Sequence, residues 1–481
     1  MARRLRRLCG AVLVLAAGGA ACAALLLQNK GIAPRSLAPY LEKRSAGHNP
    51  AIVDAGRFMA RSLLTLDRPP APLPVTVPAA FGAQPGAAGP EPAGRPVLVA
   101  SADEARRSFA AAMPGDVITF LPGRYRFTGS APPAARAGAE GAPIVVRAAQ
   151  PGTVTLEMDT GEGFLVTAPW WTFENLSLVG VCQRDADCEH AFHVVGRGAH
   201  FTALNNTVTG FNAHFKINGM GGLFPDAGRL EANTLTNAAP RRTSNPVTPV
   251  DMVAASGWTI RRNLIADFIK AEGDGISYGA FAKGGGANNL FEQNAVVCEL
   301  RLRGHPGQRV GLSLGGGGTG KQYCRDSRCI TEQDGSEVRA NLVTACSDAG
   351  IYLNRAAGSK VLFNTVLDTA GIQARYPETS ARFDGNLVDG AIHGRNDAVL
   401  HLGDNLVSAL AYAYAGYHPA RARYRAPQSL DFTWEGDAPR AAAGSAPGPD
   451  LCGSARPPVP AYGAIEQFGP CQRPFKAALS R

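Results

Sequence analysis

Short apolar stretches recur along the middle of the chain, and an asparagine stands directly ahead of each one. The stretches are rich in valine, isoleucine, leucine and threonine and are separated by glycine and asparagine, which is typical of short strands and tight turns. The spacing between successive asparagines runs from 19 to 47 residues. The nine asparagines are Asn175, Asn206, Asn233, Asn263, Asn294, Asn341, Asn364, Asn386 and Asn405. Self-similarity at a loose period of about 20–30 residues predicts a solenoid, and strands of this length predict a parallel β-helix.

The repeated asparagine has a physical explanation in such a solenoid. If it lies at the same corner of every coil, its amide can donate to one neighbouring coil and accept from the other, forming a ladder. Asparagine also tolerates the left-handed backbone conformation. We therefore expect each asparagine to take that conformation at its corner.

A second repeat is a pentapeptide with glycine first, apolar residues second and fourth, and variable residues third and fifth. It occurs at Gly279–Lys283, Gly311–Gly315, Gly350–Asn354 and Gly371–Arg375, and more loosely at His214–Asn218 and Met252–Ser256. The alternation of a strand places the second and fourth residues inward and the third and fifth outward. Stacking then predicts an outward column of Asn218, Ser256, Lys283, Gly315, Asn354 and Arg375. A second outward column consists of Lys216, Ala254, Phe281, Ser313, Tyr352 and Gln373.

These patterns divide the chain into four parts. Residues 97–410 form the predicted β-helix, and Ala102–Met113 looks like a helix that covers its N-terminal end, with Ser101 as N-cap and Glu104 three residues later. Residues 28–96 are expected to be a helical stalk followed by a linker rich in proline and alanine. Residues 411–481 are expected to be an irregular extension that wraps the C-terminal end of the solenoid.

Residues 1–27 indicate export. Four arginines precede an uncharged run of 19 residues, Cys9–Leu27. This length is closer to a membrane span of about 20 residues than to the apolar core of a signal peptide. We favour a membrane anchor, with a cleaved signal or a lipoprotein as alternatives. Each interpretation predicts a periplasmic or cell-surface protein.

The cysteines agree with an oxidising compartment, because eight of them, an even number, remain after Cys9 and Cys22 are left out. Local spacing favours three disulfides, and the other two cysteines follow Asn294 and Asn341 at similar distances. The predicted pairs are Cys182–Cys188, Cys298–Cys346, Cys324–Cys329 and Cys452–Cys471. A zinc site at Cys324 and Cys329 is the alternative, but no second ligand pair has suitable spacing.

The formal net charge of +9 includes the arginines near the N-terminus, so the remaining basic excess is modest. It is compatible with an acidic substrate, and equally with an ordinary solvated surface. We expect no nucleic acid partner, and we expect a monomer.

Two segments resemble a known family. Pro114–Tyr125 reads PGDVITFLPGRY and Gly141–Thr155 reads GAPIVVRAAQPGTVT. Both resemble the opening of chondroitinase B and the related alginate lyases. The resemblance implies a single-stranded, right-handed parallel β-helix of the pectin-lyase-like kind, and an enzyme that cleaves acidic polysaccharides by β-elimination. It covers residues 97–410 as architecture, but only the opening and one later segment in motif detail.

The later segment is Lys283–Asn294, which aligns with the segment that carries the catalytic lysine of that family. The family's arginine and histidine, however, fall on glycine at residues 315–317. The acidic pair that binds calcium in the family is also missing, because Glu272 and Asp274 lie too far upstream. The resemblance therefore implies Lys283 as a catalytic base, and it leaves open whether the chain is an enzyme.

The outward columns supply the remaining candidate residues. Polar and cationic side chains beside Gly315 suggest a groove for an extended polysaccharide, although a solvated sheet face would also be polar. The predicted substrate-binding residues are Lys216, Asn218, Ser313, Tyr352, Asn354 and Arg375. A non-catalytic carbohydrate-binding or envelope-structural module is the alternative function.

No metal or other cofactor is assigned from the sequence. Asp185, Asp187 and Glu189 alternate as oxygen ligands of calcium can do, with His190 and His193 close after them. Short acidic loops are usually only solvated, so calcium stays an open alternative.

Overall fold

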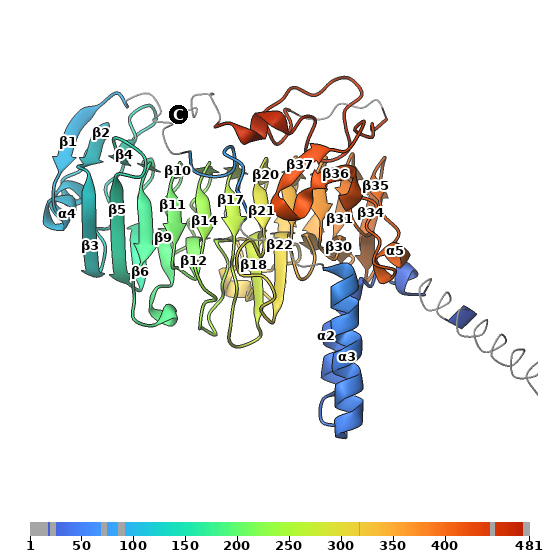
Figure 1. The fold of residues 1–481 in the computed structure, drawn as a ribbon. Coiled ribbons are helices and arrows are strands. Elements are labelled where there is room, and N and C mark those ends of the chain that lie inside the picture. The colour runs from blue at the N-terminus through green and yellow to red at the C-terminus, as the bar shows by residue number, and fades with distance from the viewer. Residues whose placement is uncertain are drawn as a thin grey trace, which may run out of the picture.

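The computed structural model describes residues 18–19, 26–68, 75–84, 92–316, 318–442 and 448–474. Within these residues, strands stack into an elongated prism with three long parallel sheets (Figure 1). Neighbours in each sheet come from successive coils; β10, for example, pairs in parallel with β7 on one side and β13 on the other. This topology confirms the predicted all-β parallel β-helix.

The strands have the following bounds. The 12-stranded sheet consists of β1 Arg95–Val99, β2 Asp116–Phe120, β4 Ile144–Ala148, β7 Trp171–Glu174, β10 Thr202–Leu204, β13 Arg229–Glu231, β16 Thr259–Arg261, β20 Leu290–Glu292, β24 Glu337–Arg339, β28 Ser359–Leu362, β31 Ser380–Asp384 and β34 Val399–Leu402. The 11-stranded sheet consists of β3 Gly123–Gly129, β5 Val154–Thr160, β8 Ser177–Gly180, β11 Thr207–Thr209, β14 Thr234–Thr236, β17 Leu264–Ala266, β21 Ala295–Val297, β25 Leu342–Thr344, β29 Thr365–Leu367, β32 Leu387–Val388 and β35 Leu406–Val407. The 9-stranded sheet consists of β6 Glu162–Val166, β9 His190–Val195, β12 Ala213–Asn218, β15 Val250–Val253, β18 Ile276–Lys283, β22 Gln308–Leu314, β26 Ile351–Asn354, β30 Ile372–Arg375 and β33 Ile392–Arg395. Shorter strands are β19 Gly286–Ala287, β23 Gln333–Asp334, β27 Ala356–Ala357, β36 Tyr424–Ala426 and β37 Asp431–Trp434.

The asparagine ladder is present along most of the solenoid. From Asn206 to Asn405, each side-chain nitrogen donates to the side-chain oxygen of the next ladder asparagine at 2.8–3.0 Å. The same oxygen also accepts the backbone N–H of the preceding ladder asparagine at 2.9–3.1 Å. The amides are thus satisfied by one another inside the prism, where an unpaired amide would be costly.

Two details of the ladder differ from the prediction. Asn175 does not belong to it, since the backbone of Leu176 takes that place and donates to Asn206. From Asn206 to Asn386, the left-handed conformation falls on the residue before each ladder asparagine, as at Ala232, Gln293 and Phe363. The amide must point along the stack to reach its neighbours, and the corner residue ahead of it makes the turn.

Helix α4, Ala102–Ala110, covers the N-terminal end of the solenoid, as expected (Figure 1). The hydroxyl of Ser101 accepts the N–H of Glu104 at 3.2 Å, and the Glu104 carboxylate accepts the N–H of Ala100 at 2.7 Å. This reciprocal capping fixes the start of the helix. The side chain of Phe109 is buried against the first coils.

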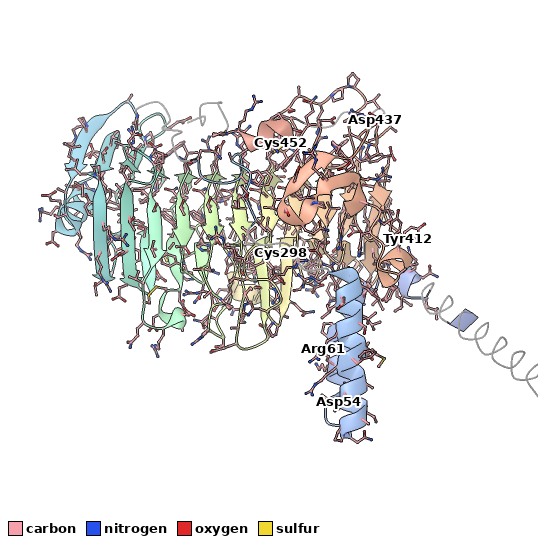
Figure 2. The ribbon with its side chains drawn as sticks, in the orientation of Figure 1. Asp54, Arg61, Cys298, Tyr412, Asp437 and Cys452 are labelled. Carbon is pink, nitrogen blue, oxygen red and sulfur yellow. A yellow bond between two sulfur atoms is a disulfide. The ribbon has the colours of Figure 1, made fainter. Side chains whose placement is uncertain are left out.

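The predicted stalk is a helical hairpin that projects from the side of the solenoid (Figure 1). Helices α2, Pro34–Ser45, and α3, Pro50–Asp67, pack along each other, and Asp54 and Arg61 lie on the projecting part (Figure 2). The base of the hairpin docks on the β-helix, where the buried Arg35 guanidinium contacts carboxylates from both parts of the chain.

The segments on either side of the solenoid also differ from the prediction. Residues 75–84, expected to be linker, lie on the outer face of the 11-stranded sheet, with Phe81 buried there and the Ala83 N–H donating to Thr234. In the extension, the described residues from Ala420 onward pack along the same outer face, where Ile465 and Phe468 are buried, whereas the extension was expected to wrap the C-terminal end. Apolar side chains on the outside of β17, β21 and β25 explain both placements, because they need cover.

The extension begins with α5, Leu410–Tyr414, and short 3-10 helices occur at Asp185–Asp187, Lys321–Tyr323, Arg421–Arg423, Pro427–Ser429 and Gly469–Gln472. Within the described residues, no helix is both long enough and apolar enough to cross a membrane. Most of the predicted anchor in residues 1–27 lies outside those residues.

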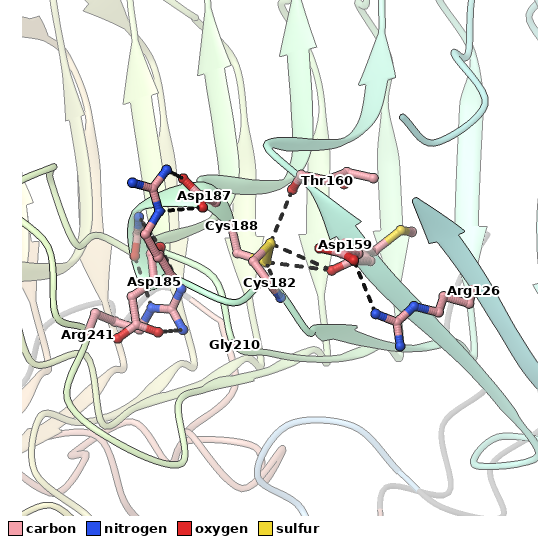
Figure 3. Close-up of a disulfide and its surroundings, with 12 residues drawn as sticks. Arg126, Asp159, Thr160, Cys182, Asp185, Asp187, Cys188, Gly210 and Arg241 are labelled. Carbon is pink, nitrogen blue, oxygen red and sulfur yellow. Dashed lines mark hydrogen bonds and ion pairs between the residues drawn. A yellow bond between two sulfur atoms is a disulfide. The ribbon is translucent and has the colours of Figure 1, made fainter. Parts of the chain in front are cut away.

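All four predicted disulfides are present: Cys182–Cys188, Cys298–Cys346, Cys324–Cys329 and Cys452–Cys471. Figure 3 shows the first of them beside the turn that carries Asp185 and Asp187. Cys298 and Cys346 join successive coils, whereas Cys324 and Cys329 close a loop beside the 9-stranded sheet.

Candidate functional site

The outward face of the 9-stranded sheet carries the predicted columns, with one change of register. Lys216 lies opposite Asp251, and Asp251 lies opposite Phe281. Asp251 and Val253 therefore occupy the places that we predicted for Ala254 and Ser256. The segment has Pro249 where the four closest repeats have glycine, and Ala254, directly after the strand, has a φ of 64°.

A cleft of about 520 Å³ lies over β12, β15 and β18. Lys216, Asn218, Val253 and Lys283 belong to its floor. Residues 219–224 form one wall, and residues 318–327, which contain the Cys324–Cys329 disulfide, form the other. The cleft exists because two loops rise from a flat sheet, so its chemistry combines the predicted columns with side chains of the loops.

The two walls are clamped together by Arg325. Its guanidinium binds the Asp226 carboxylate through two contacts of 2.7 and 2.8 Å, and it stacks over the Phe224 ring at 4.4 Å from the ring centre. Paired, planar contacts of this kind hold an arginine in one orientation. We infer that the width of the cleft is fixed before any ligand binds.

Lys216 of the floor forms a partly buried ion pair with Asp251, which lies just below the surface. Lys216 Nζ lies 2.9 Å from Asp251 Oδ2, and the other carboxylate oxygen of Asp251 is buried without a hydrogen-bond partner among the described residues. This oxygen is an unused acceptor, but it lies below the surface of the cleft, whose lining does not include Asp251.

Lys283 is different from the other cations of the cleft. It forms no hydrogen bond or ion pair with any described residue, and its Nζ lies over the Phe281 ring, 4.4 Å from the ring centre. Burial lowers the pKa of Lys283, and the nearby Asp251 carboxylate opposes this shift only in part. A desolvated amine with a lowered pKa is suited to accept a proton or to bind an anion.

Glu332 is a residue of the site that the sequence analysis missed. Its carboxylate is buried and accepts the N–H of Gly284 and the hydroxyl of Thr319, both at 2.9 Å. It thereby ties the second wall to the end of β18, directly beside Lys283. The 47-residue gap between Asn294 and Asn341 was the signal of a long loop, but no repeat position pointed to Glu332.

The other predicted substrate-binding residues lie outside the cleft. Tyr352 and Arg375 line a separate hollow of about 360 Å³, which residues 31–36 border on one side. Between the two hollows, Ser313 is buried and its hydroxyl donates to the Gly315 carbonyl, while Asn354 is buried and donates to the Tyr352 hydroxyl at 3.0 Å. The structure thus brings together Lys216, Asn218 and Lys283, and separates them from Tyr352 and Arg375.

Gly315 does not leave an open spot in a groove. It has a φ of 70°, and a β-carbon at this position would lie 1.9 Å from the carbonyl oxygen of Asn354. The close approach of two coils requires glycine here.

The hollow beside Tyr352 has its own acidic group, Asp348, whose pKa is raised by burial.

Comparison with known structures gives neighbours at low sequence identity. Pectate lyase Pel9A aligns with a TM-score of 0.48 and 15% identity over 75% of this chain and 90% of its own. The alginate lyase from Paenibacillus sp. str. FPU-7 has a TM-score of 0.36 and 14% identity, over 65% of this chain and 99% of its own. The PL6 family polysaccharide lyase Pedsa3628 from Pseudopedobacter saltans has a TM-score of 0.35 and 14% identity, over 68% and 94% of the two chains. A scan against protein-family models and a search of curated proteins found no match.

The acidic loop ahead of β9 has protein partners for its carboxylates. Asp187 pairs with Arg184 at 2.7 Å, and Asp185 pairs with Arg241 at 2.9 Å (Figure 3). Glu189 accepts the side-chain amide of Asn245 at 2.5 Å. Each carboxylate is directed to its own partner.

Proposed function

We propose that the protein is an exported β-helix that engages an acidic polysaccharide in the cleft over β12, β15 and β18. The observation that carries the proposal is the state of Lys283, a desolvated cation without a protein counter-ion among the described residues. A carboxylate of the sugar chain supplies that counter-ion. Asn218 lies in the same floor, and its side-chain amide can bind a hydroxyl group.

A lyase-like reaction is the first form of this function. β-Elimination needs a base that removes the proton next to the sugar carboxylate and a positive group that stabilises the charge that develops. Lys283 is the candidate base, because its lowered pKa favours the neutral amine more than in an ordinary lysine. The resemblance of Lys283–Asn294 to the lysine segment of alginate lyases supports the same role.

A non-catalytic binding module is the second form, and one observation favours it. The other two cations of the cleft are engaged, Lys216 by Asp251 and Arg325 by Asp226. Neither is free to neutralise a sugar carboxylate unless its own pair opens. Binding then requires only Lys283 and the polar floor.

Incubation of the purified chain with alginate, chondroitin and pectate distinguishes the two forms. Absorbance of the unsaturated product measures elimination, a reducing-end assay measures hydrolysis, and calorimetry measures binding. The variant Lys283→Met removes the ammonium and keeps an unbranched side chain. Lys360→Met is the matched control, because Lys360 is exposed on β28 of another sheet.

Product formation that is lost in Lys283→Met and kept in Lys360→Met supports the lyase. Binding without turnover, weakened by Lys283→Met alone, supports the module. If the chain neither binds nor cleaves any of these acidic polysaccharides, the proposal is contradicted.

The proposed location is the periplasm or the cell surface, with residues 1–27 as tether. The four disulfides support an oxidising compartment. Fractionation of the expressing cells, with and without alkaline extraction of membranes, tests the tether.

A further inference from the structure

Three side chains with metal-binding atoms meet on the 9-stranded sheet, next to the cleft. Glu162 begins β6, and His190 and His193 belong to β9. Their ligand atoms lie within 4.8 Å of one another. The Glu162 carboxylate is 3.0 Å from Nδ1 of His193 and 3.9 Å from Nδ1 of His190. Figure 1 shows β6, β9 and β12 side by side.

The hydrogen bonds around His193 determine where its lone pair lies. Its Nε2 is 2.9 Å from the side-chain oxygen of Asn218, and the Asn218 amide nitrogen donates to the Gly219 carbonyl at 3.0 Å. Because that oxygen can only accept, Nε2 of His193 carries the proton. In the neutral ring, Nδ1 then presents a lone pair toward the carboxylate.

The Nδ1 atoms of both histidines are unused by the rest of the protein that the structure describes. Nδ1 of His193 and Nδ1 of His190 are both buried without a hydrogen-bond partner among the described residues. Two imidazole nitrogens and a carboxylate oxygen thus converge, with their ligand atoms close enough together to share one ion.

We propose that Glu162, His190 and His193 bind a first-row transition metal ion, with Zn²⁺ as the best fit. Imidazole nitrogen and carboxylate oxygen suit zinc, copper, iron and nickel, whereas calcium prefers oxygen ligands alone. Three protein ligands leave a coordination position for water or a ligand. Glu162 is 45% exposed, so that position is reached from solvent.

The surroundings of the cluster fit this role. Asn218 orients His193 by accepting its other ring proton, as carbonyl groups commonly do behind metal-binding histidines. Lys216 lies opposite His193 on the neighbouring strand, and its charge is neutralised by the ion pair with Asp251. Asn218 is shared between this site and the cleft floor, which places the ion beside any chain that the cleft binds. The inference stands whether or not the cleft binds a polysaccharide.

The test uses the full chain, purified without a histidine tag and stripped with a chelator. Calorimetry with Zn²⁺ measures stoichiometry and affinity, and Co²⁺ serves as a spectroscopic probe whose visible absorption reports nitrogen and oxygen ligands. We expect one ion per chain and a rise in thermal midpoint on adding Zn²⁺. Glu162→Gln and His193→Ala should weaken binding by more than about 100-fold, and Asn218→Ala by about 10–100-fold.

His401→Ala is the matched control, since His401 is exposed on β34 of another sheet, and it should bind Zn²⁺ as the parent chain does. Glu162→Gln tests the site even if a histidine variant folds poorly, because Glu162 is half-exposed. The proposal is overturned if the parent chain takes up no stoichiometric ion, or if Glu162→Gln and His193→Ala bind Zn²⁺ as tightly as His401→Ala.

Discussion

Arg35 and Asp368 form a buried ion pair of 2.9 Å, although 333 residues separate them in the sequence. The Arg35 guanidinium also binds Asp67 at 2.6 Å and donates to the Cys346 carbonyl at 2.8 Å. Arg421, from the C-terminal extension, binds the Asp67 carbonyl at 2.7 Å. This single cluster joins the helical hairpin, the β-helix and the extension.

The variant Arg35→Met should therefore destabilise the protein strongly. It leaves the carboxylates of Asp67 and Asp368 buried with one partner fewer, and loss of one member of a buried ion pair costs about 3–5 kcal/mol. Denaturant unfolding measures the loss, and limited proteolysis shows whether the hairpin has come away. Arg57→Met is the control, because Arg57 is exposed on α3 and 3.9 Å from Asp54, and its stability should change by less than about 0.5 kcal/mol. Equal stability of the two variants would contradict the role of Arg35.

The same cluster predicts sensitivity to acid. Burial alone would raise the pKa of Asp368. The attraction of four nearby guanidinium groups is stronger than this effect and lowers the pKa well below its ordinary value. These groups belong to Arg35, Arg421, Arg303 and Arg68. A carboxylate with a lowered native pKa stabilises the fold fully above the unfolded pKa of about 3.9, and this stabilisation is lost as pH falls toward the native pKa.

We expect the contribution of Asp368 to the free energy of unfolding to be constant above about pH 5 and to decrease below about pH 4. Chemical unfolding at a series of pH values measures the slope. Asp368→Asn should be less stable at neutral pH, yet its stability should fall less steeply in acid, by up to about 1.4 kcal/mol per pH unit. Parallel curves for the two proteins would show that Asp368 does not carry the effect.

The sequence predicts the solenoid well because the ladder amides have to recur once per coil. It predicts the corner conformation poorly, because the left-handed residues ahead of the ladder asparagines differ in type, as Ala232, Gln293 and Phe363 show, and no residue type marks them. The docking of the hairpin on the β-helix could not be predicted from the sequence either, because Arg35 and Asp368 belong to no common sequence pattern.

The candidate site was predicted in part for a related reason. Lys216, Asn218 and Lys283 were found because they occupy repeat positions on the sheet. Asp251 was missed because Pro249 stands where the four closest repeats have the glycine that we used to set the register. Glu332 was missed because it comes from a loop, where position depends on tertiary contacts and not on period.

The ladder itself gives a test of its energetic role. Asn294 donates to the Ile260 carbonyl at 2.8 Å and to Asn341 at 2.9 Å, and accepts two hydrogen bonds from Asn263. Asn294→Ala leaves these buried groups without partners, at a cost of about 1–3 kcal/mol for each unsatisfied group, so we expect a loss of at least about 2 kcal/mol.

Asn405 provides the comparison, because it is the last ladder residue and partly exposed, so water can replace its amide. Asn405→Ala should cost only about 0.5–1.5 kcal/mol. Thermal and denaturant unfolding measure both variants. If Asn294→Ala is no more costly than Asn405→Ala, the interior ladder does not stabilise the solenoid.

The lowered pKa of Lys283 can be measured directly. Burial disfavours the ammonium form, so Lys283 should titrate below the ordinary lysine value of about 10.4. Heteronuclear NMR of the lysine side-chain methylene groups over a pH series measures the midpoint, and Lys283→Arg assigns the resonance by its disappearance. Asp251→Asn removes the charge that favours the ammonium and leaves Lys216 unpaired nearby, so both effects should lower the Lys283 midpoint further. Lys216→Met removes a repelling cation and should raise it. A Lys283 midpoint at or above about 10.4, or shifts of the opposite sign in the two variants, would contradict the electrostatic description of the cleft.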